Sequence, residues 1–303
     1  MLRTAIGALE LQSPLLTGSG TFGHDPAALA FLEPGDLGAL VLKTVTPEPR
    51  HGNPPQRIAE FQGGVLNAIG LENKGLAYWR ESVAPQLEEV PLPVVANAGG
   101  HSVEEYLAMT EAFDAMKGVA AIELNLSCPN VADGIQFSTD TGALSEVVRA
   151  CREATQKPMW VKLSPNVASI QPFAAAAEAS GADALTVCNT LMGLLVDWRN
   201  RKPVLANGTG GMSGPAVKPM ALRMVWDASQ VVQIPIVASG GASSADDVLE
   251  FLVAGATAVQ VGTASFRRPA AISEIAADLR KILTEENLSL EELRGSLEWP
   301  RRN

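Results

Sequence analysis

The sequence predicts a single-domain α/β protein, a (β/α)8 barrel that spans residues 1–303. Short runs rich in Val, Ile and Leu alternate with longer segments of helical periodicity, which is the pattern of repeated βα units around a parallel sheet. There are eight such runs, the number that closes a barrel. The length also fits, since single barrels of this kind commonly run to about 250 residues.

The expected strands are nearly continuous aliphatic runs, which suits a sheet buried on both faces. In order they occupy residues 14–19, 39–44, 93–98, 121–127, 158–163, 184–189, 235–239 and 257–262. Helices are expected between them, for example from Ser102 and from Ser243, where serine and acidic residues suit a helix start and a later glycine suits its end. A short appended helix is expected near residues 289–297.

Two connections are too long for ordinary βα loops, and loops of that size usually carry function. Residues 45–73 are rich in proline and glycine, and residues 190–213 are rich in glycine and asparagine. No linker or internal repeat divides the chain. We therefore expect a TIM barrel with long loops over the mouth at the carboxyl ends of its strands.

The composition excludes several classes of function. A net charge of −10 disfavours nucleic-acid binding, and no apolar run approaches a membrane span, so a soluble, untargeted protein is expected. The three cysteines, Cys128, Cys151 and Cys188, lack CxxC spacing, which argues against disulfides and fits a reducing cytoplasm. The three histidines lack the spacing of metal ligands, so no metal site is expected.

The last two expected strands end in glycine-rich segments. In barrels of this kind the active site lies at the carboxyl ends of the strands, and the loops after strands 7 and 8 commonly bind phosphate. Gly240, Gly241 and Gly262 would let backbone N–H groups approach an anion, and Thr263 adds a hydroxyl. These residues predict a phosphorylated ligand, although glycines there could also serve only to make tight turns.

Two lysines, Lys43 and Lys162, each end an expected strand directly after an aliphatic residue. An ammonium in the barrel lining is costly unless an anion pairs with it. A salt bridge to a neighbouring acid is one interpretation for either lysine. Together with a phosphate site, the pair indicates charge stabilisation on an electron-rich ring such as a reduced flavin.

Asparagines collect at the same expected strand ends and in the first long connection: Asn67, Asn97, Asn125, Asn130 and Asn189. A carboxamide offers both donors and an acceptor, which suits a planar ligand edged with alternating C=O and N–H groups. A pyrimidine dione fits that description. Any single asparagine could equally cap a helix or a turn.

Cys128 opens a polar loop, NLSCPN, just beyond an expected strand end. An unperturbed thiol, with a pKa of about 8.5, can act as a base, as a nucleophile or as inert packing. Cys151 and Cys188 are expected to be packing residues. The glycine-rich stretch 208–214 is interpreted as a loop that closes over a cofactor.

Taken in series, several segments make the chain resemble the soluble, class 1 dihydroorotate dehydrogenases. They include SGTFG from Ser19, NPPQRIAEFQGGVLNAIGLENKG from Asn53, NLSCPNV, VKLSPNV, CNT, GGMSGPAVKPMALRMV, ASGG and VQVGTASF. The resemblance implies FMN across the barrel mouth, with dihydroorotate stacked on it. The implied FMN ligands are Ser19, Lys43, Thr44, Asn97, Asn125, Lys162, Cys188, Gly214, Gly240, Gly241, Gly262 and Thr263. The implied substrate ligands are Lys43, Asn67, Ala68, Ile69, Gly70, Leu71, Asn125, Asn130, Asn189 and Thr190.

The resemblance also implies a reaction, the oxidation of dihydroorotate to orotate in de novo pyrimidine (UMP) biosynthesis. Cys128 would remove a proton from C5 while C6 delivers hydride to flavin N5. Lys162 would offset the charge that develops on the flavin. Residues 131–142 are the expected lid over the site.

Within the family, the motifs look more like the class 1B enzymes, which pass electrons to NAD through a partner subunit that holds FAD and a [2Fe-2S] cluster. This implies a homodimer of catalytic chains within a heterotetramer. The membrane-bound class 2 is disfavoured, because it carries serine as the base and an N-terminal extension. The alternatives are a fumarate-dependent class 1A enzyme, a related FMN barrel acting on another pyrimidine, and a barrel without redox activity.

Overall fold

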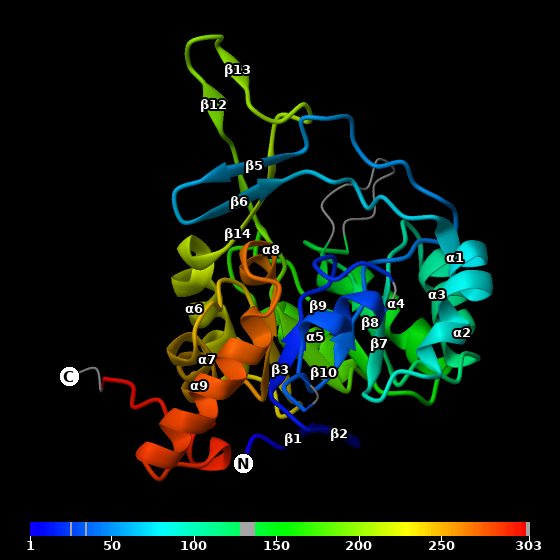
Figure 1. The fold of residues 1–303 in the computed structure, drawn as a ribbon. Helices are drawn as coiled ribbons and strands as arrows, with labels where there is room; N and C mark the ends of the chain where they lie inside the picture. Colours follow the sequence, from blue (N-terminus) through cyan, green and yellow to red (C-terminus); the bar gives the residue numbers. More distant parts are fainter. Residues whose placement is uncertain (25, 34, 128–136, 301–303) are drawn as a thin grey trace.

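The computed structural model describes residues 1–24, 26–33, 35–127 and 137–300. Its centre is an eight-stranded parallel sheet surrounded by helices (Figure 1). The first and last strands of the sheet meet through a parallel bridge between Leu16 and Ala39, and the Gly38 amide donates to the Leu15 carbonyl oxygen at 2.8 Å. The strands follow the order β3 (Leu15–Thr17), β16 (Ala258–Val261), β15 (Ile236–Ser239), β10 (Ala184–Val187), β9 (Met159–Lys162), β8 (Ala121–Asn125), β7 (Val94–Ala98) and β4 (Leu40–Val41).

All eight predicted strands and the predicted (β/α)8 architecture are thus confirmed. The helices of the described chain are α1 (Gly75–Tyr78), α2 (Ala84–Leu87), α3 (Val103–Asp114), α4 (Thr141–Glu153), α5 (Gln171–Ala179), α6 (Lys218–Ser229), α7 (Ala245–Val253), α8 (Thr263–Arg267), α9 (Ala271–Glu285) and α10 (Leu290–Leu293). A π-helical turn at Trp79–Val83 joins α1 to α2, and 3-10 turns occupy Pro26–Phe31 and Pro215–Val217. No helix of the described residues is both long and apolar enough to cross a membrane.

Serine side chains cap the helices whose starts the sequence predicted most closely. Ser102 accepts a hydrogen bond from the Glu105 amide at the start of α3. Ser244 forms a capping box with Asp247 at the start of α7. Ser289 begins the appended helix α10 in the same way. These caps satisfy amides that have no partner within the helix, which is why the helices begin there.

The lower interior of the barrel, at the end opposite the carboxyl ends of the strands, is apolar, and a hairpin closes it. Leu16, Val41 and Trp160 are fully buried there. A hairpin of β1 (Thr4–Ile6) and β2 (Leu9–Leu11), which was not predicted, adds Ile6 and Leu11 to the same cluster. Figure 1 shows this hairpin at the end of the barrel opposite the long connections. Because side chains fill the lower end, the barrel formed by the described residues opens at the carboxyl ends of its strands.

The two long connections form a second sheet above the barrel mouth. This cap sheet is antiparallel and follows the order β11 (Leu191–Gly193), β14 (Gly210–Ser213), β6 (Gly64–Asn67) and β5 (Ile58–Phe61). A hairpin of β12 (Val196–Asp197) and β13 (Lys202–Pro203) projects beyond it (Figure 1). The interpretation of residues 208–214 as a loop was therefore wrong in detail, since most of the segment is strand β14. The glycines of β14 carry no β-strand signal of their own.

Replacing a leucine in the lower barrel should destabilise the protein far more than replacing one on its surface. Leu16→Ala removes a fully buried side chain and should lower the free energy of unfolding by about 2–5 kcal/mol. Leu194→Ala, at a position that is 54% exposed, is the matched control and should stay within about 0.5 kcal/mol. Thermal and urea unfolding measure both variants. Equal losses would contradict the described barrel interior.

Candidate active site

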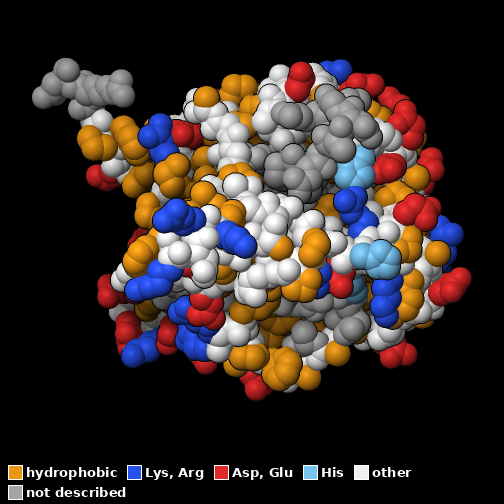
Figure 2. Space-filling view, turned by 90° about the horizontal axis from the view of Figure 1, so that it is seen from above, with side chains coloured by type: hydrophobic (Ala, Val, Ile, Leu, Met, Phe, Trp, Pro, Cys, Tyr) orange, Lys and Arg blue, Asp and Glu red, His pale blue; other side chains and the backbone are white. Residues whose placement is uncertain are grey.

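A cavity of about 480 Å³ lies between the carboxyl ends of the barrel strands and the cap sheet. This volume is within the range of small-molecule sites. In the view onto the cap side, most acidic side chains lie toward the outline of the molecule and the centre is largely uncharged (Figure 2). The lining includes most of the predicted site residues: Ser19, Lys43, Thr44, Asn67, Ala68, Ile69, Gly70, Leu71, Asn125, Lys162, Cys188, Asn189, Thr190, Gly240, Gly241, Gly262 and Thr263.

Four predicted residues stand apart from this lining. Asn97 is fully buried and is not among the described residues that line the cavity. Gly214 lies just behind the lining, because its carbonyl oxygen would be 2.9 Å from a Cβ placed on Gly241. Cys128 and Asn130 fall outside the described residues, as does most of the expected lid. The described end of the lid segment leads into α4, where Asp140 caps the helix.

One end of the cavity is a cradle of glycine backbone. Gly240 and Gly241 have φ values of 133° and 89°, which side-chain-bearing residues rarely adopt. A Cβ on Gly241 would also come within 2.8 Å of the Lys218 backbone nitrogen. Gly262 precedes α8, whose first amides have no partner within the helix. This geometry fits a phosphate group bound by backbone N–H groups, as predicted.

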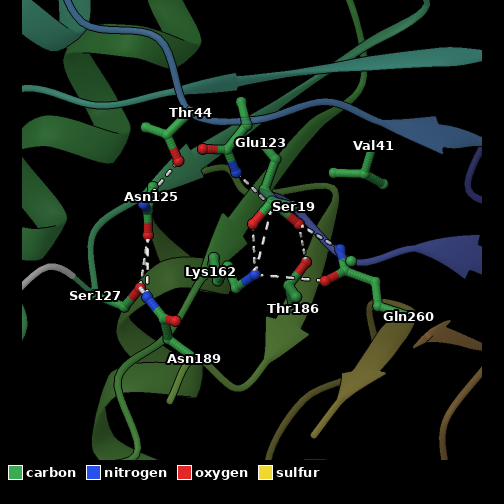
Figure 3. Close-up of polar contacts among 12 residues, drawn as sticks. Ser19, Val41, Thr44, Glu123, Asn125, Ser127, Lys162, Thr186, Asn189 and Gln260 are labelled. Carbon is green, nitrogen blue, oxygen red and sulfur yellow. Dashed lines mark hydrogen bonds and ion pairs between the residues drawn. The ribbon is translucent and has the colours of Figure 1, made fainter. Parts of the chain in front are cut away.

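Lys162 lies at the floor of the cavity and is almost fully buried. Its ammonium donates to Ser19 Oγ at 2.9 Å and to Gln260 Oε1 at 3.4 Å, and it lies 3.9 Å from a carboxylate oxygen of Glu123 (Figure 3). Both interpretations of this lysine therefore apply, since it lines the cavity and is also paired with an acid. These contacts fix the side chain of Lys162 at the place where a ligand would rest.

Lys43 lines the cavity from the end of β4. Burial lowers its pKa, while the carboxylate of Glu72 opposes this shift and the guanidinium of Arg57 adds to it. Arg57 and Glu72 form an ion pair with each other, so Glu72 is shared between two cations. An anionic ligand beside Lys43 would therefore stabilise the charged form of the lysine.

Amide and hydroxyl groups form a connected array beside the floor. Ser127 donates to Asn125 Oδ1 at 2.7 Å, and the Asn189 amide donates to Ser127 Oγ at 2.6 Å (Figure 3). The Asn125 amide donates to Thr44 Oγ1 at 3.2 Å. Asn189 also accepts a hydrogen bond from the Thr190 backbone. Because these groups hold one another, their orientation is set before a ligand binds.

The cap sheet unites the remaining predicted substrate ligands. Asn67, the last residue of β6, pairs with Gly211 of β14, and its amide donates to the Gly211 carbonyl oxygen at 3.3 Å. A Cβ on Gly211 would lie 2.1 Å from Thr190 Oγ1, so only glycine leaves room for Thr190. Segments 67–71 and 189–190 thus meet above one cavity although they lie far apart in the sequence.

The two described cysteines are poor bases. Burial raises the pKa of Cys188 to about 12, although the Lys162 ammonium opposes the shift. Burial also raises the pKa of Cys151 to about 11. Both thiols stay protonated at neutral pH, as expected of packing residues. Cys188 nevertheless lines the cavity, so its predicted contact with the cofactor stays a prediction.

Sequence reasoning missed several polar residues at and below the floor, namely Glu123, Ser127, Thr186 and Gln260. Ser127 and Gln260 line the cavity, whereas Glu123 and Thr186 are fully buried beneath it. A signal for Glu123 was present, because it is a lone charge within the apolar run AIEL. Gln260 and Thr186 have no comparable signal, since single polar residues are common in strands.

The fold and the cavity define a class of protein, a TIM barrel whose mouth has a glycine cradle that fits a phosphate group and a buried lysine at its floor. A sequence model described as dihydroorotate dehydrogenase matches residues 1–283. The chain belongs to the dihydroorotate dehydrogenase family. The resemblance found in the motifs is thereby confirmed over most of the chain.

Curated relatives agree over nearly the full length. A protein of Trichlorobacter lovleyi is 50% identical over 97% of both chains, and one of Pelobacter propionicus is 48% identical with the same coverage. A Geobacter protein is 46% identical over 98% of both chains. All three are named dihydroorotate dehydrogenase B (NAD(+)), catalytic subunit. These names favour the NAD-linked subclass over the fumarate-dependent alternative.

A solved structure supports the fold independently. The crystal structure of a dihydroorotate dehydrogenase from Eimeria tenella, in complex with ferulenol, superimposes with a TM-score of 0.82. The superposition covers 97% of this chain and 88% of the Eimeria tenella chain, and the two sequences are 23% identical. At that identity the likeness concerns the barrel architecture.

The two described thiols should resist alkylation in the folded protein. In the FMN-free Cys128→Ser variant, iodoacetamide at about pH 8 should modify Cys151 and Cys188 more than about a hundredfold more slowly than in urea, because native thiolate is scarce. Mass spectrometry of tryptic peptides gives both rates. Modification of native Cys188 at the unfolded rate would contradict its described burial.

Proposed function

We propose that the chain is the FMN-containing catalytic subunit of an NAD-linked dihydroorotate dehydrogenase, which oxidises dihydroorotate to orotate in pyrimidine biosynthesis. The observation that carries this proposal is one cavity that joins a glycine phosphate cradle, a buried lysine and an amide array in a member of this family. A cytoplasmic location is part of the proposal, and the two free cysteines among the described residues support it.

The residues present fit FMN. When bound, FMN supplies the hydride acceptor. Gly240, Gly241, Gly262 and Thr263 would hold its phosphate through backbone amides and a hydroxyl. Lys162 would place its positive charge toward the ring, where negative charge increases on reduction. Ser19, Thr44, Asn97, Asn125, Cys188 and Gly214 complete the proposed cofactor ligands.

Dihydroorotate would bind beside the amide array. Asn67, Asn125 and Asn189 line the cavity and offer donors and acceptors to a ring edged with C=O and N–H groups. The substrate also carries a carboxylate, and Lys43 offers the ammonium that such an anion requires. Residues 67–71, Thr190 and Asn130 complete the proposed substrate ligands.

Cys128 would act as the base. It directly follows Ser127, whose hydroxyl is tied to both Asn125 and Asn189 at the cavity wall. Cys128 would take the proton from C5 while hydride leaves C6, so that a C5–C6 double bond forms. An unperturbed thiol has a pKa of about 8.5, close enough to neutral pH for a workable thiolate fraction.

The electrons would leave through a partner subunit. A [2Fe-2S] cluster takes four protein ligands, usually thiolates, and this chain has three cysteines without cluster spacing. The FAD and the cluster that link the reaction to NAD would therefore reside in a second chain. Relatives named as catalytic subunits support the existence of a second subunit. The homodimer of catalytic chains within a heterotetramer is proposed from the family resemblance.

The purified chain should be yellow and should release FMN on denaturation. It should oxidise dihydroorotate with an artificial acceptor, and it should reduce NAD only with the co-expressed partner subunit. Flavin absorbance and orotate formation measure these properties. Fumarate-dependent turnover by the isolated chain would contradict the NAD linkage. Uracil reduction would indicate a related pyrimidine enzyme, and a colourless protein that binds no FMN would overturn the proposal.

Cys128→Ser should bind FMN normally but lose at least about a hundredfold in turnover at neutral pH, since a hydroxyl is a far weaker base. Part of the activity should return as the pH rises. Cys151→Ser is the matched control, because Cys151 lies buried on α4 away from the cavity, and it should keep its turnover per bound flavin. Unchanged turnover of Cys128→Ser would remove Cys128 from the base role.

A further inference from the structure

A carboxylate is fully buried inside the barrel, directly beneath the cavity floor. Glu123 on β8 accepts hydrogen bonds from the Asn97 amide at 2.6 Å, from Thr186 Oγ1 at 2.5 Å and from the Gln260 amide at 2.9 Å. Gln260 belongs to β16, which is not a neighbour of β8 in the sheet. The side chain of Glu123 therefore reaches across the barrel interior.

These contacts are those of a carboxylate that accepts hydrogen bonds on both oxygens. All three bonded atoms donate to the carboxyl oxygens, two of them from amide nitrogens that cannot accept. The Lys162 ammonium lies 3.9 Å from Glu123 Oε1 (Figure 3). Several donors and a nearby cation favour the charged form of a buried carboxyl group. Glu123 is fully buried and is not among the described residues that line the cavity, so a ligand above the floor would not contact it directly.

Lys162 depends on the same network. Gln260 links the two charges, since its carbonyl oxygen accepts from Lys162 while its amide donates to Glu123. Ser19 supplies the only other described hydrogen bond to the ammonium. A lysine that is only 4% exposed would lose its proton readily without an anion beside it.

We propose that Glu123 is a positioning residue that keeps Lys162 protonated and fixed at the cavity floor, so that a full positive charge faces the bound cofactor. The part of this proposal that concerns the flavin rests on the proposed function, whereas the charge pair itself does not. A preorganised charge at this place would stabilise the reduced cofactor without reorganisation during the reaction.

Glu123→Gln preserves the shape of the side chain and removes its charge. The network can adapt, because Asn97 Oδ1 is buried without a hydrogen-bond partner and can turn to accept from the new amide. Two other titratable groups lie close by. Burial raises the pKa of Cys188 to about 12, which keeps that thiol neutral, and Lys43 lines the same cavity.

The first test follows the midpoint potential and absorbance of the bound flavin between about pH 6 and 10, where a buried lysine without its anion should titrate. Glu123→Gln should show a deprotonation step that the wild type lacks, and its potential should fall below the wild-type value above that step. Glu123→Asp, which restores an anion, should suppress the step. Glu123→Gln/Lys162→Met should lack it, which assigns the step to Lys162 and not to Lys43.

Thr186→Val is the matched control for this experiment. It removes one hydrogen bond to Glu123 and keeps both charges, so its potential should follow the wild type with pH. A Glu123→Gln profile parallel to the wild type, or raised equally at every pH, would overturn the proposal. So would a Glu123→Asp variant that titrates as Glu123→Gln does, because charge would then not be the cause.

The second test needs no flavin. In the FMN-free protein, Lys162→Met leaves a buried anion without its cation, whereas the double variant Glu123→Gln/Lys162→Met removes both charges. The double variant should therefore unfold at a higher temperature than Lys162→Met alone. A double variant that is no more stable would overturn the charge pair. This result stands even if the chain were to bind another cofactor, so it separates the inference from the proposed function.

Discussion

The bridge that joins β3 to β4 closes the barrel, and the rest of the molecule depends on this closure. Backbone pairing at Leu16 and Ala39 joins the first two barrel strands in chain order, which stand at the two ends of the sheet. Only then do the carboxyl ends of all eight strands face one mouth. Ser19, Lys43, Asn125 and Lys162 reach the same cavity for that reason.

The interior of the barrel is divided into an apolar lower part and a polar upper part. The lower part, with Leu16 and Trp160, adds buried apolar area to the larger core cluster that includes Phe113 and Phe251. The upper part holds Glu123 and Lys162, whose charges are costly to bury unless hydrogen bonds satisfy them. Because the network lies directly under the cavity, the buried charges also set a fixed electrostatic field at the site.

The cap sheet completes the cavity from above. Its pairing of Asn67 with Gly211 joins one long connection to the other, and together they form the wall opposite the barrel strands. The small residues of β14 allow this close approach, since a side chain at Gly211 would collide with Thr190. The proposed cofactor groups thus come mainly from the barrel, whereas many of the proposed substrate groups come from the cap.

The sequence alone determined the barrel, its eight strands and the best helix caps, and most of the site residues predicted from it line the cavity. These features are local: aliphatic runs, capping serines, and polar or glycine residues where strands end. Tertiary structure decided the cap sheet, the closing hairpin at the lower end, and the positions of Asn97 and Glu123 below the floor. Those features depend on contacts between segments that lie far apart in the chain, such as β6 and β14. The sequence of one such segment does not indicate which other segment it pairs with.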